Sequence, residues 1–406
     1  MSKKMKLGIL RETKNPPDKR VPVSPPQIVK MIERFPDVEV YVQPSDIRCF
    51  PDEEYNYLEL NLKEDLSDCD ILIGVKEVEP STLIPDKTYM FFAHVGKKQD
   101  YNRGLLQEIV KKKIKLIDYE YLTDYKGQRI VAFGRWAGIV GAYNGLRARG
   151  LYTNAFELKP AHQCRDLEEM FAGLYRVDLK PKKILVTGGG RVAMGAMETL
   201  SELNIREVSP EDFLQKEFDE PVLCRLDPEH YVKHRTGADF NYEHFFQHPD
   251  EYVSTFKPYT KVTDIYIACH FWHPKSPVFI TKEDMKEPDF NINVIADVSC
   301  DVNGPIASTI RASTIADPFY DYNPMTEEEE APFSSDRNIT VMAVDNLPGE
   351  LPRNASADFG ETLIDEVFPS LFGYDDKGII DRATITGNGK LTEKFSYLQK
   401  YLEGKE

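Results

Sequence analysis

The sequence predicts an α/β protein with two domains, each built on a parallel sheet flanked by helices. Short apolar runs alternate with amphipathic stretches, which is typical of strand–helix–strand units rather than of a β-sandwich. Three consecutive glycines at 188–190 follow one such apolar run directly and open a helix. Because the chain has 406 residues, of which 41% are hydrophobic, it is long enough to bury two separate cores.

The first third of the chain predicts a sheet of its own. We expect its strands at 6–10, 38–42, 70–75, 88–93 and 114–118. A helix is expected over 99–113, where Leu105, Leu106 and Ile109 recur at helical spacing and basic residues close the segment.

Two polar side chains each end an apolar strand of this region. Lys76 follows DILIGV and His94 follows TYMFFA. Ligands bind at the carboxyl ends of parallel strands, and a desolvated lysine near another cation loses pKa and becomes usable as an acid or base. We therefore interpret Lys76 and His94 as a candidate acid/base pair. A surface lysine and a hydrogen-bonded turn histidine are the alternative.

The balance of charge restricts the class of ligand. Lys plus Arg number 51 against 67 Asp plus Glu, a formal charge of −16 that would repel nucleic acid and anionic membranes. An anionic substrate must then meet a local basic cluster, for which Arg20 and Arg129 are candidates because arginine binds carboxylates bidentately. A solvated basic face remains the alternative.

The glycine turn predicts a dinucleotide site. A strand is expected at 184–187, and Gly188, Gly190 and Ala193 then fit the pattern G-x-G-x-x-G/A, in which small residues let a pyrophosphate approach the backbone at a helix N-terminus. We assign the intervening Arg191 and Val192 to the same site. An ordinary glycine-rich turn is the alternative, and no Gly-Lys-Ser/Thr follows, which excludes a P-loop.

The type of dinucleotide depends on the next strand, expected at 205–208. An NAD site commonly has a carboxylate about 20 residues after the first glycine, and Ser209 stands near that place. The missing carboxylate leaves NAD and NADP both open, with Arg191 or Arg206 as partners for a 2′-phosphate.

The remaining chain completes the second sheet. We expect a buried connecting helix at 137–152, strands at 264–268, 292–298 and 339–344, and helices at 354–372 and 392–402. The stretch 209–260 is charged, aromatic and interrupted by prolines, and is interpreted as an insertion to which no chemistry is assigned. The helix at 354–372 is suited to carry the chain back to the first domain.

The cysteines, two histidines and the N-terminal segment indicate neither a metal site nor secretion. The six cysteines form no C-x-x-C pair, and His270 and His273 are interpreted as loop histidines rather than metal ligands. The apolar run at the N-terminus is too short for a signal peptide, so a cytoplasmic location is expected. A homo-oligomer is left open.

Eight motifs together resemble one family. They are RETKNPPDKRVPVSP, GVKEVE, FFAHVGKKQ, LIDYEYL, RIVAFGRWAG, ADVSCDVNG, VDNLPGELPRNAS and ITGNGKLTEK. In this order they resemble the alanine dehydrogenase/saccharopine dehydrogenase superfamily, above all the lysine–2-oxoglutarate reductase part of aminoadipic semialdehyde synthase and the lysine-forming saccharopine dehydrogenases.

The resemblance implies a fold and a reaction. The fold would be two Rossmann-like domains, a substrate domain at 1–136 plus 354–406 and a dinucleotide domain at 137–353, with the active site in the cleft between them. The reaction would be an NAD(P)-dependent oxidoreduction at a CH–NH group that interconverts lysine plus 2-oxoglutarate and saccharopine.

The resemblance also implies roles for residues. Lys76 and His94 match the acid/base pair, and Glu77 and Glu120 match carboxylates that tune it. The matches to residues that receive substrate carboxylates are Arg20 and Arg129, and the matches to the loops beside the nicotinamide are Asp301, Asp345 and Leu347. Two other functions stay open: an alanine-dehydrogenase-like enzyme acting on a small amino acid, and a non-catalytic dinucleotide-binding sensor.

Overall fold

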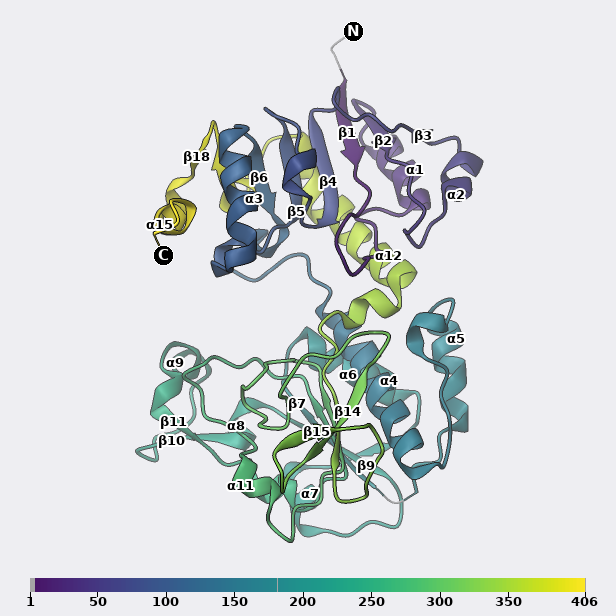
Figure 1. The fold of residues 1–406 in the computed structure, drawn as a ribbon, viewed down its shortest axis with the longest axis vertical. Coiled ribbons are helices and arrows are strands. Elements are labelled where there is room, and N and C mark those ends of the chain that lie inside the picture. Colours follow the sequence, from purple (N-terminus) through teal and green to yellow (C-terminus); the bar gives the residue numbers. More distant parts are fainter. Residues whose placement is uncertain (1–3, 181, 406) are drawn as a thin grey trace. The chain divides into compact units, whose positions relative to one another are not determined.

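The computed structural model describes residues 4–180 and 182–405. The chain divides into two compact units, one containing the residues up to Phe133 together with those from Pro352 onward, and one containing Gly134–Leu351. Each unit contains an eight-stranded sheet (Figure 1). The predicted α/β class, with two largely parallel sheets flanked by helices, is confirmed.

The sheet of the first unit has the order β18-β17-β6-β5-β4-β1-β2-β3. Neighbours from β6 to β3 pair in parallel, whereas β17 and β18 add antiparallel strands at one edge. Its strands are β1 Met5–Ile9, β2 Val38–Val42, β3 Asn61–Leu62, β4 Ile71–Lys76, β5 Thr88–Phe92, β6 Lys115–Asp118, β17 Thr384–Gly387 and β18 Lys390–Leu391.

The helices of this unit come from both the N-terminal and the C-terminal parts of the chain. They are α1 Pro25–Arg34, α2 Asp52–Tyr57, α3 Asp100–Lys111, α12 Pro352–Thr362, α13 Phe368–Phe372, α14 Ile379–Ala383 and α15 Gln399–Leu402. The helix expected at 354–372 is present as α12, a π-helical turn at Leu363–Val367 and α13. The expected tail helix forms a 3₁₀ turn at Glu393–Leu398 followed by α15.

The sheet of the second unit has the order β15-β14-β16-β13-β12-β7-β9-β8. Its strands are β7 Lys183–Thr187, β8 Arg206–Glu207, β9 Val222–Leu226, β12 Ile265–Ala268, β13 Val294–Asp297, β14 Phe319–Asn323, β15 Glu328–Glu330 and β16 Ile339–Met342, with a separate hairpin of β10 Val232–His234 and β11 Tyr252–Ser254. Its helices are α4 Gly134–Thr153, α5 Leu167–Ala172, α6 Arg191–Ser201, α7 Pro210–Gln215, α8 Pro228–Tyr231, α9 Tyr242–Gln247, α10 Lys257–Thr260 and α11 Lys282–Met285.

The strand order corrects one prediction. The strand expected at 205–208 exists only as the two-residue β8 at the edge of the sheet, and β9 lies between it and β7. β9 belongs to the stretch 209–260, so this stretch supplies a core strand as well as short helices and a hairpin. Its sequence, VLCRL, is buried except at Arg225. Because this charged residue interrupts the apolar run and the flanking residues are also charged, the strand could not be recognised from the sequence.

The long helix α4 packs closely on α6, the helix that follows the glycine turn. A Cβ atom on Gly138 would lie 1.8 Å from the carbonyl oxygen of Val192, and one on Gly195 would lie 2.0 Å from that of Arg135. Only glycine allows two helix backbones to approach this closely. The small residues of α4 thus fix the position of the helix that opens the predicted dinucleotide site. Within the described residues, no helix is both long and apolar enough to span a membrane.

Candidate active site

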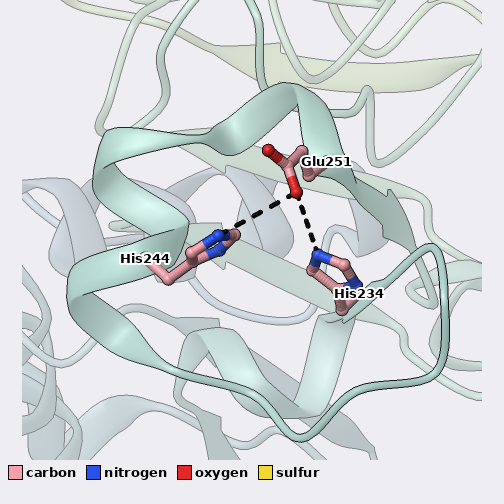
Figure 2. Close-up of side chains that lie close together, drawn as sticks. All are labelled: His234, His244 and Glu251. Atoms are coloured by element: carbon pink, nitrogen blue, oxygen red, sulfur yellow. Dashed lines mark hydrogen bonds and ion pairs between the residues drawn. The ribbon is translucent and has the colours of Figure 1, made fainter.

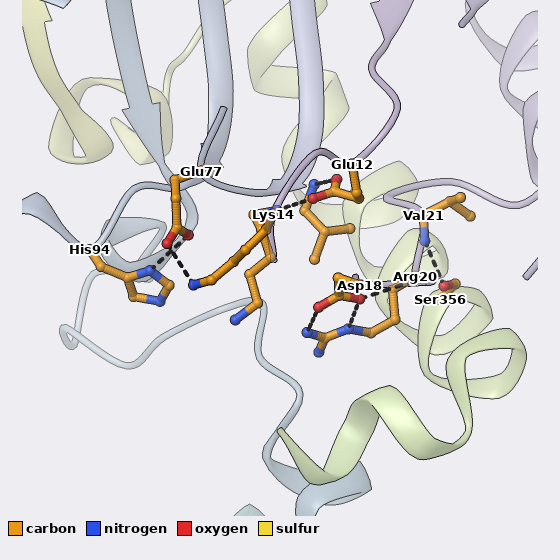
Figure 3. A network of polar contacts seen from close by, with 10 residues as sticks. Glu12, Lys14, Asp18, Arg20, Val21, Glu77, His94 and Ser356 are labelled. Carbon is orange, nitrogen blue, oxygen red and sulfur yellow. Dashed lines mark hydrogen bonds and ion pairs between the residues drawn. The ribbon is translucent and has the colours of Figure 1, made fainter. Parts of the chain in front are cut away.

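Lys76 and His94 lie at the ends of two adjacent parallel strands. Lys76 is the last residue of β4 and pairs in register with Phe92, the last residue of β5. His94 follows two positions later with φ of 55°, a left-handed conformation that is unusual for a residue with a side chain. This backbone turn directs the imidazole toward the end of β4 (Figure 3).

Glu77 lies between two basic groups. Its Oε1 accepts a hydrogen bond of 2.6 Å from Lys14 Nζ, and its Oε2 lies 3.4 Å from His94 Nδ1. Burial opposes ionisation of this carboxyl, but the contacts with His94 and Lys14 outweigh it and lower the pKa of Glu77 to about 2. Glu77 is therefore a fixed negative charge beside the imidazole of His94.

The amine of Lys76 sits in a position that disfavours its charge. Burial lowers the pKa of Lys76, and the positive charges of Arg20 and Lys14 lower it further, against an opposing effect of Asp18. Its backbone amide donates 2.9 Å to Glu12 Oε2. The pKa of the lysine is therefore shifted in the direction that favours proton transfer near neutrality.

Glu12 holds the end of β4 in place. Its two carboxyl oxygens accept from the backbone amides of Val75, at 2.6 Å, and Lys76, at 2.9 Å. Burial raises the pKa of Glu12 to about 8 in spite of these bonds. The roles of Glu12 and Lys14 could not be predicted from the sequence, because both residues reach the end of β4 from a distant part of the chain.

Arg20 is buried against Asp18. Its Nε donates 2.9 Å to Asp18 Oδ1, its Nη2 donates 2.5 Å to Oδ2, and its guanidinium lies 4.2 Å from the centre of the Phe133 ring. The charge of Arg20 in turn lowers the pKa of Asp18 to about 2, against the effect of burial. Arg20 is thus a rigid cation beside Lys76.

Glu120 and Arg129 lie together after the next strand, β6. Arg129 Nη2 is 3.5 Å from Glu120 Oε1, and Lys97 Nζ is 3.6 Å from the same oxygen. Asp118 at the end of β6 accepts from the backbone amide of Glu120 at 2.9 Å, and burial raises its pKa to about 7. Arg129 is half-exposed, so its guanidinium remains accessible to an anion.

The glycine turn in the second unit has the geometry that the pattern requires. Gly188 has φ of 110°, and a Cβ there would lie 2.6 Å from the carbonyl oxygen of Cys269, so no other residue fits without a shift. Gly190 caps the N-terminus of α6, and a Cβ there would meet nothing within 4 Å. Ala193 is buried in the first turn of α6, whereas Arg191 is exposed. Open space therefore lies over the N-terminus of this helix.

A cavity of about 600 Å³ lies over the turn. Residues 188–192, which include Val192, form one side, and aromatic side chains of α8 and α9 form another. His270, at the end of β12, also lines it; burial lowers its pKa to about 3, and its Nε2 has no hydrogen-bond partner among the described residues. A cavity of this size with an unpaired polar atom suits a nucleotide.

Asp227 takes the place expected for the carboxylate that selects the cofactor. It directly follows β9, the neighbour of β7, and lines the cavity. Arg225 pairs with it at 2.6 and 3.0 Å. Ser209 instead caps α7, accepting from Asp212 N at 3.1 Å, and does not line the cavity. The strand order therefore contradicts the premise of the Ser209 prediction, which assumed that the edge strand β8 was the neighbour of β7.

The two loops expected beside the nicotinamide lie at adjacent strand ends. Asp301 follows β13, and Asp345 and Leu347 follow β16, which pairs in parallel with β13. Cys300 Sγ contacts the Ala343 carbonyl at 3.1 Å and ties the loops together. Burial raises the pKa of Asp301. These ends and the glycine turn share the carboxyl edge of one sheet, as a dinucleotide site requires.

Residues 8–140 match the protein family "Alanine dehydrogenase/PNT, N-terminal domain". The first third of the chain therefore resembles an alanine dehydrogenase/PNT N-terminal domain. The whole chain is similar to the mitochondrial alpha-aminoadipic semialdehyde synthase of Mus musculus, at 31% identity over 98% of this chain and 48% of the relative. It thus spans about half the length of that relative.

Two further similarities cover both chains almost completely. The saccharopine dehydrogenase [NAD(+), L-lysine-forming] of Emericella nidulans is 26% identical over 92% of each chain. The solved structure of an L-alanine dehydrogenase matches with a TM-score of 0.65 and 14% identity, over 99% of this chain and all of the other, which shows a shared fold. The resemblance to the alanine dehydrogenase/saccharopine dehydrogenase superfamily is confirmed.

Proposed function

We propose that this chain is an NAD(P)-dependent dehydrogenase of amino-acid metabolism that interconverts lysine plus 2-oxoglutarate and saccharopine. One observation carries the proposal: Lys76, with a lowered pKa, lies at a strand end adjacent to that of His94, and both are flanked by the charges of Glu77, Lys14 and Arg20. The similarity to semialdehyde synthases and saccharopine dehydrogenases supports the choice of substrates.

The proposed reaction needs several proton transfers at one nitrogen and one oxygen. The ε-amine of lysine attacks the keto carbon of 2-oxoglutarate, and the carbinolamine oxygen must then gain a proton and leave as water. The nitrogen must lose a proton before attack and carries one in the resulting iminium. A bound nicotinamide supplies the hydride that reduces this carbon, which gives saccharopine.

Lys76 and His94 are proposed to share these proton transfers. A lysine with a lowered pKa can accept a proton from the attacking amine, and the imidazole can donate one to the departing hydroxyl. Glu77 lies beside Nδ1 of the imidazole, so Nε2 is the ring nitrogen farther from this carboxylate. The same groups work in reverse during hydrolysis of the imine, so the site serves either direction.

The substrates carry carboxylates that need cationic partners. Saccharopine has three carboxylates, for which Arg129 is the proposed accessible partner and Arg20 a fixed positive charge in the same unit. Glu120 holds Arg129 in place from one side. This division gives one arginine a binding role and the other a largely electrostatic one.

The proposed cofactor preference is NAD(H). Asp227 would accept hydrogen bonds from a ribose 2′-hydroxyl and repel a 2′-phosphate. The paired Arg225 fixes this carboxylate and offsets part of its charge. The glycine turn, Asp301, Asp345 and Leu347 are the remaining proposed contacts.

The test is a coupled assay on the full chain. Oxidation of NADH is followed with 2-oxoglutarate and each of the twenty amino acids, and separately with pyruvate plus ammonia. The proposal expects turnover with lysine and little with the others. Turnover with pyruvate plus ammonia alone would instead assign an alanine-dehydrogenase-like activity, and cofactor binding without any turnover would leave a sensor.

A further inference from the structure

Two histidines and a glutamate converge in the stretch between β9 and β12, to which the sequence analysis assigned no chemistry. His234 ends β10, His244 lies in α9, and Glu251 ends a 3₁₀ turn just before β11. Glu251 Oε2 lies 3.2 Å from His234 Nε2 and 3.9 Å from His244 Nε2. The two imidazoles point at this one carboxylate from different elements (Figure 2).

We propose that His234, His244 and Glu251 bind a divalent transition-metal ion, Zn²⁺. One donor atom of each side chain lies within 4.8 Å of the others. Imidazole nitrogen and carboxylate oxygen bind zinc at about 2.0–2.2 Å, so two ligands of a tetrahedral ion lie about 3.3 Å apart. The His234–Glu251 separation of 3.2 Å is close to this value, and a small rotation of the half-exposed His244 would bring its Nε2 into range.

The other ring nitrogen of each histidine is held by a hydroxyl group. His234 Nδ1 lies 2.8 Å from Thr236 Oγ1, and His244 Nδ1 lies 3.2 Å from the hydroxyl of Tyr252, which itself donates to the Asn241 carbonyl at 3.4 Å. An Nδ1–H that donates to oxygen leaves the lone pair of Nε2 for a metal. The backbone amide of Thr236 also lies 3.3 Å from His234 Nδ1. This longer contact would be a hydrogen bond only in the other tautomer, in which Nδ1 carries no proton.

The surroundings favour a cation. The two histidines border a hollow of about 410 Å³ that is also lined by Asp239 and Glu243. His248 Nδ1 lies 3.9 Å from the second carboxylate oxygen of Glu251. The hollow leaves room for water at the fourth position of the metal, as in sites with three protein ligands.

The ion would join α9 to the β10–β11 hairpin. The same helix directs Tyr242, Phe245 and Phe246 into the cavity over the glycine turn, whereas none of the three ligands lines that cavity. The metal would therefore have a structural role and stabilise one wall of the cavity. This role does not depend on the reaction proposed above.

Titration of the full chain with ZnCl₂, after removal of metals with EDTA, tests the proposal by calorimetry and thermal unfolding. We expect one Zn²⁺ per chain and a rise in Tm. His234→Ala should weaken this binding by more than about 100-fold, since loss of outer-shell partners alone reduces metal affinity about 10–100-fold. His273→Ala removes an exposed histidine outside the cluster and should bind zinc like the wild type.

A second pair of variants protects the test against misfolding. His244→Gln should lose the zinc-dependent rise in Tm while its metal-free Tm stays near that of the wild type. Thr236→Ala keeps all three ligands and should weaken binding about 10–100-fold. The proposal is overturned if the wild type binds Zn²⁺ no more tightly than both His234→Ala and His244→Gln, because the cluster would then be only a histidine–carboxylate contact.

Discussion

The two candidate sites of this chain depend on different parts of the polypeptide, one on the backbone and the other on side chains. The cavity in the second unit depends on backbone: a left-handed glycine, a helix N-terminus and the ends of neighbouring parallel strands. The Lys76 site in the first unit depends on side chains, with Glu12, Lys14, Arg20 and Glu77 all acting on one amine or its strand. The first arrangement shapes a space, and the second sets protonation states.

This difference predicts different responses to substitution. A side chain placed in a space shaped by backbone should block binding but leave chemistry at bound substrate unchanged. Loss of one charge from a cluster should alter pKa values and turnover more than binding. The variants below separate the two responses.

The largest effect is expected from loss of the ionisable groups at the Lys76 site. Lys76→Met and His94→Gln should each lower kcat about 10²–10⁴-fold, the usual contribution of positioned acid/base groups, with smaller changes in KM. The measurement is steady-state oxidation of NADH with lysine and 2-oxoglutarate. Lys115→Met, which alters an exposed lysine of β6, is the control and should retain wild-type kcat. Wild-type kcat in both site variants would remove the acid/base assignment.

The next effect is expected at the glycine turn. Gly190→Val places a branched side chain in the open space over α6, where a pyrophosphate would lie, so NADH affinity should fall more than about tenfold without loss of the fold. Titration of NADH fluorescence measures it. Gly387→Val is matched to it, because a Cβ there also meets nothing within 4 Å, and it should bind NADH normally. Equal affinities would place the dinucleotide elsewhere.

The carboxylate of Glu77 should make stability depend on pH. Its folded pKa of about 2 lies below the model-peptide value near 4.5, so its contribution is present above about pH 4.5 and disappears as the pH falls toward 2. Glu77→Gln should lower the free energy of unfolding by about 1–2 kcal/mol at pH 7, after allowance for solvent screening, and by less at low pH.

Urea unfolding of Glu77→Gln and wild type at pH 7 and pH 3 provides this comparison. Glu79→Gln, on an exposed neighbour, should unfold like the wild type at both values. A difference between Glu77→Gln and wild type that stayed constant between pH 7 and pH 3 would contradict the proposed charge contacts with Lys14 and His94.

The smallest effect is expected at Asp227. Asp227→Ser removes the repulsion of a 2′-phosphate and leaves Arg225 without its partner, so the ratio of kcat/KM for NADPH to that for NADH should rise about tenfold, equivalent to ~1.4 kcal/mol. Ser209→Asp, at a residue outside the cavity, should leave this ratio unchanged. A shift in the Ser209 variant but not in the Asp227 variant would reverse the assignment.

Features that depend on local sequence could be predicted. The strands that lead to Lys76 and His94, the glycine turn and the connecting helix α4 each follow from hydrophobic periodicity or from a short pattern. The position of β9 could not be predicted in this way, since a charged residue interrupts its apolar run and an extra edge strand precedes it. For this reason the sequence pointed to Ser209 and not to Asp227, the residue now proposed to select the cofactor.

Contacts between segments that are distant in the chain could not be predicted from the sequence either. Glu12 and Lys14 meet the end of β4 only after the sheet forms, and the pattern of charges near the N-terminus does not distinguish them from solvated residues. The cluster of His234, His244 and Glu251 has no spacing typical of a metal motif, and it arises because a hairpin and a short helix fold together.

The most direct test of the account is the double variant Lys76→Met/His94→Gln, compared with both single variants at saturating lysine, 2-oxoglutarate and NADH. If the two groups share one course of proton transfer, the loss of kcat in the double variant should be smaller than the product of the single losses, because residues that act as a unit are not additive. A double loss equal to that product would show two independent groups and contradict the proposed pair.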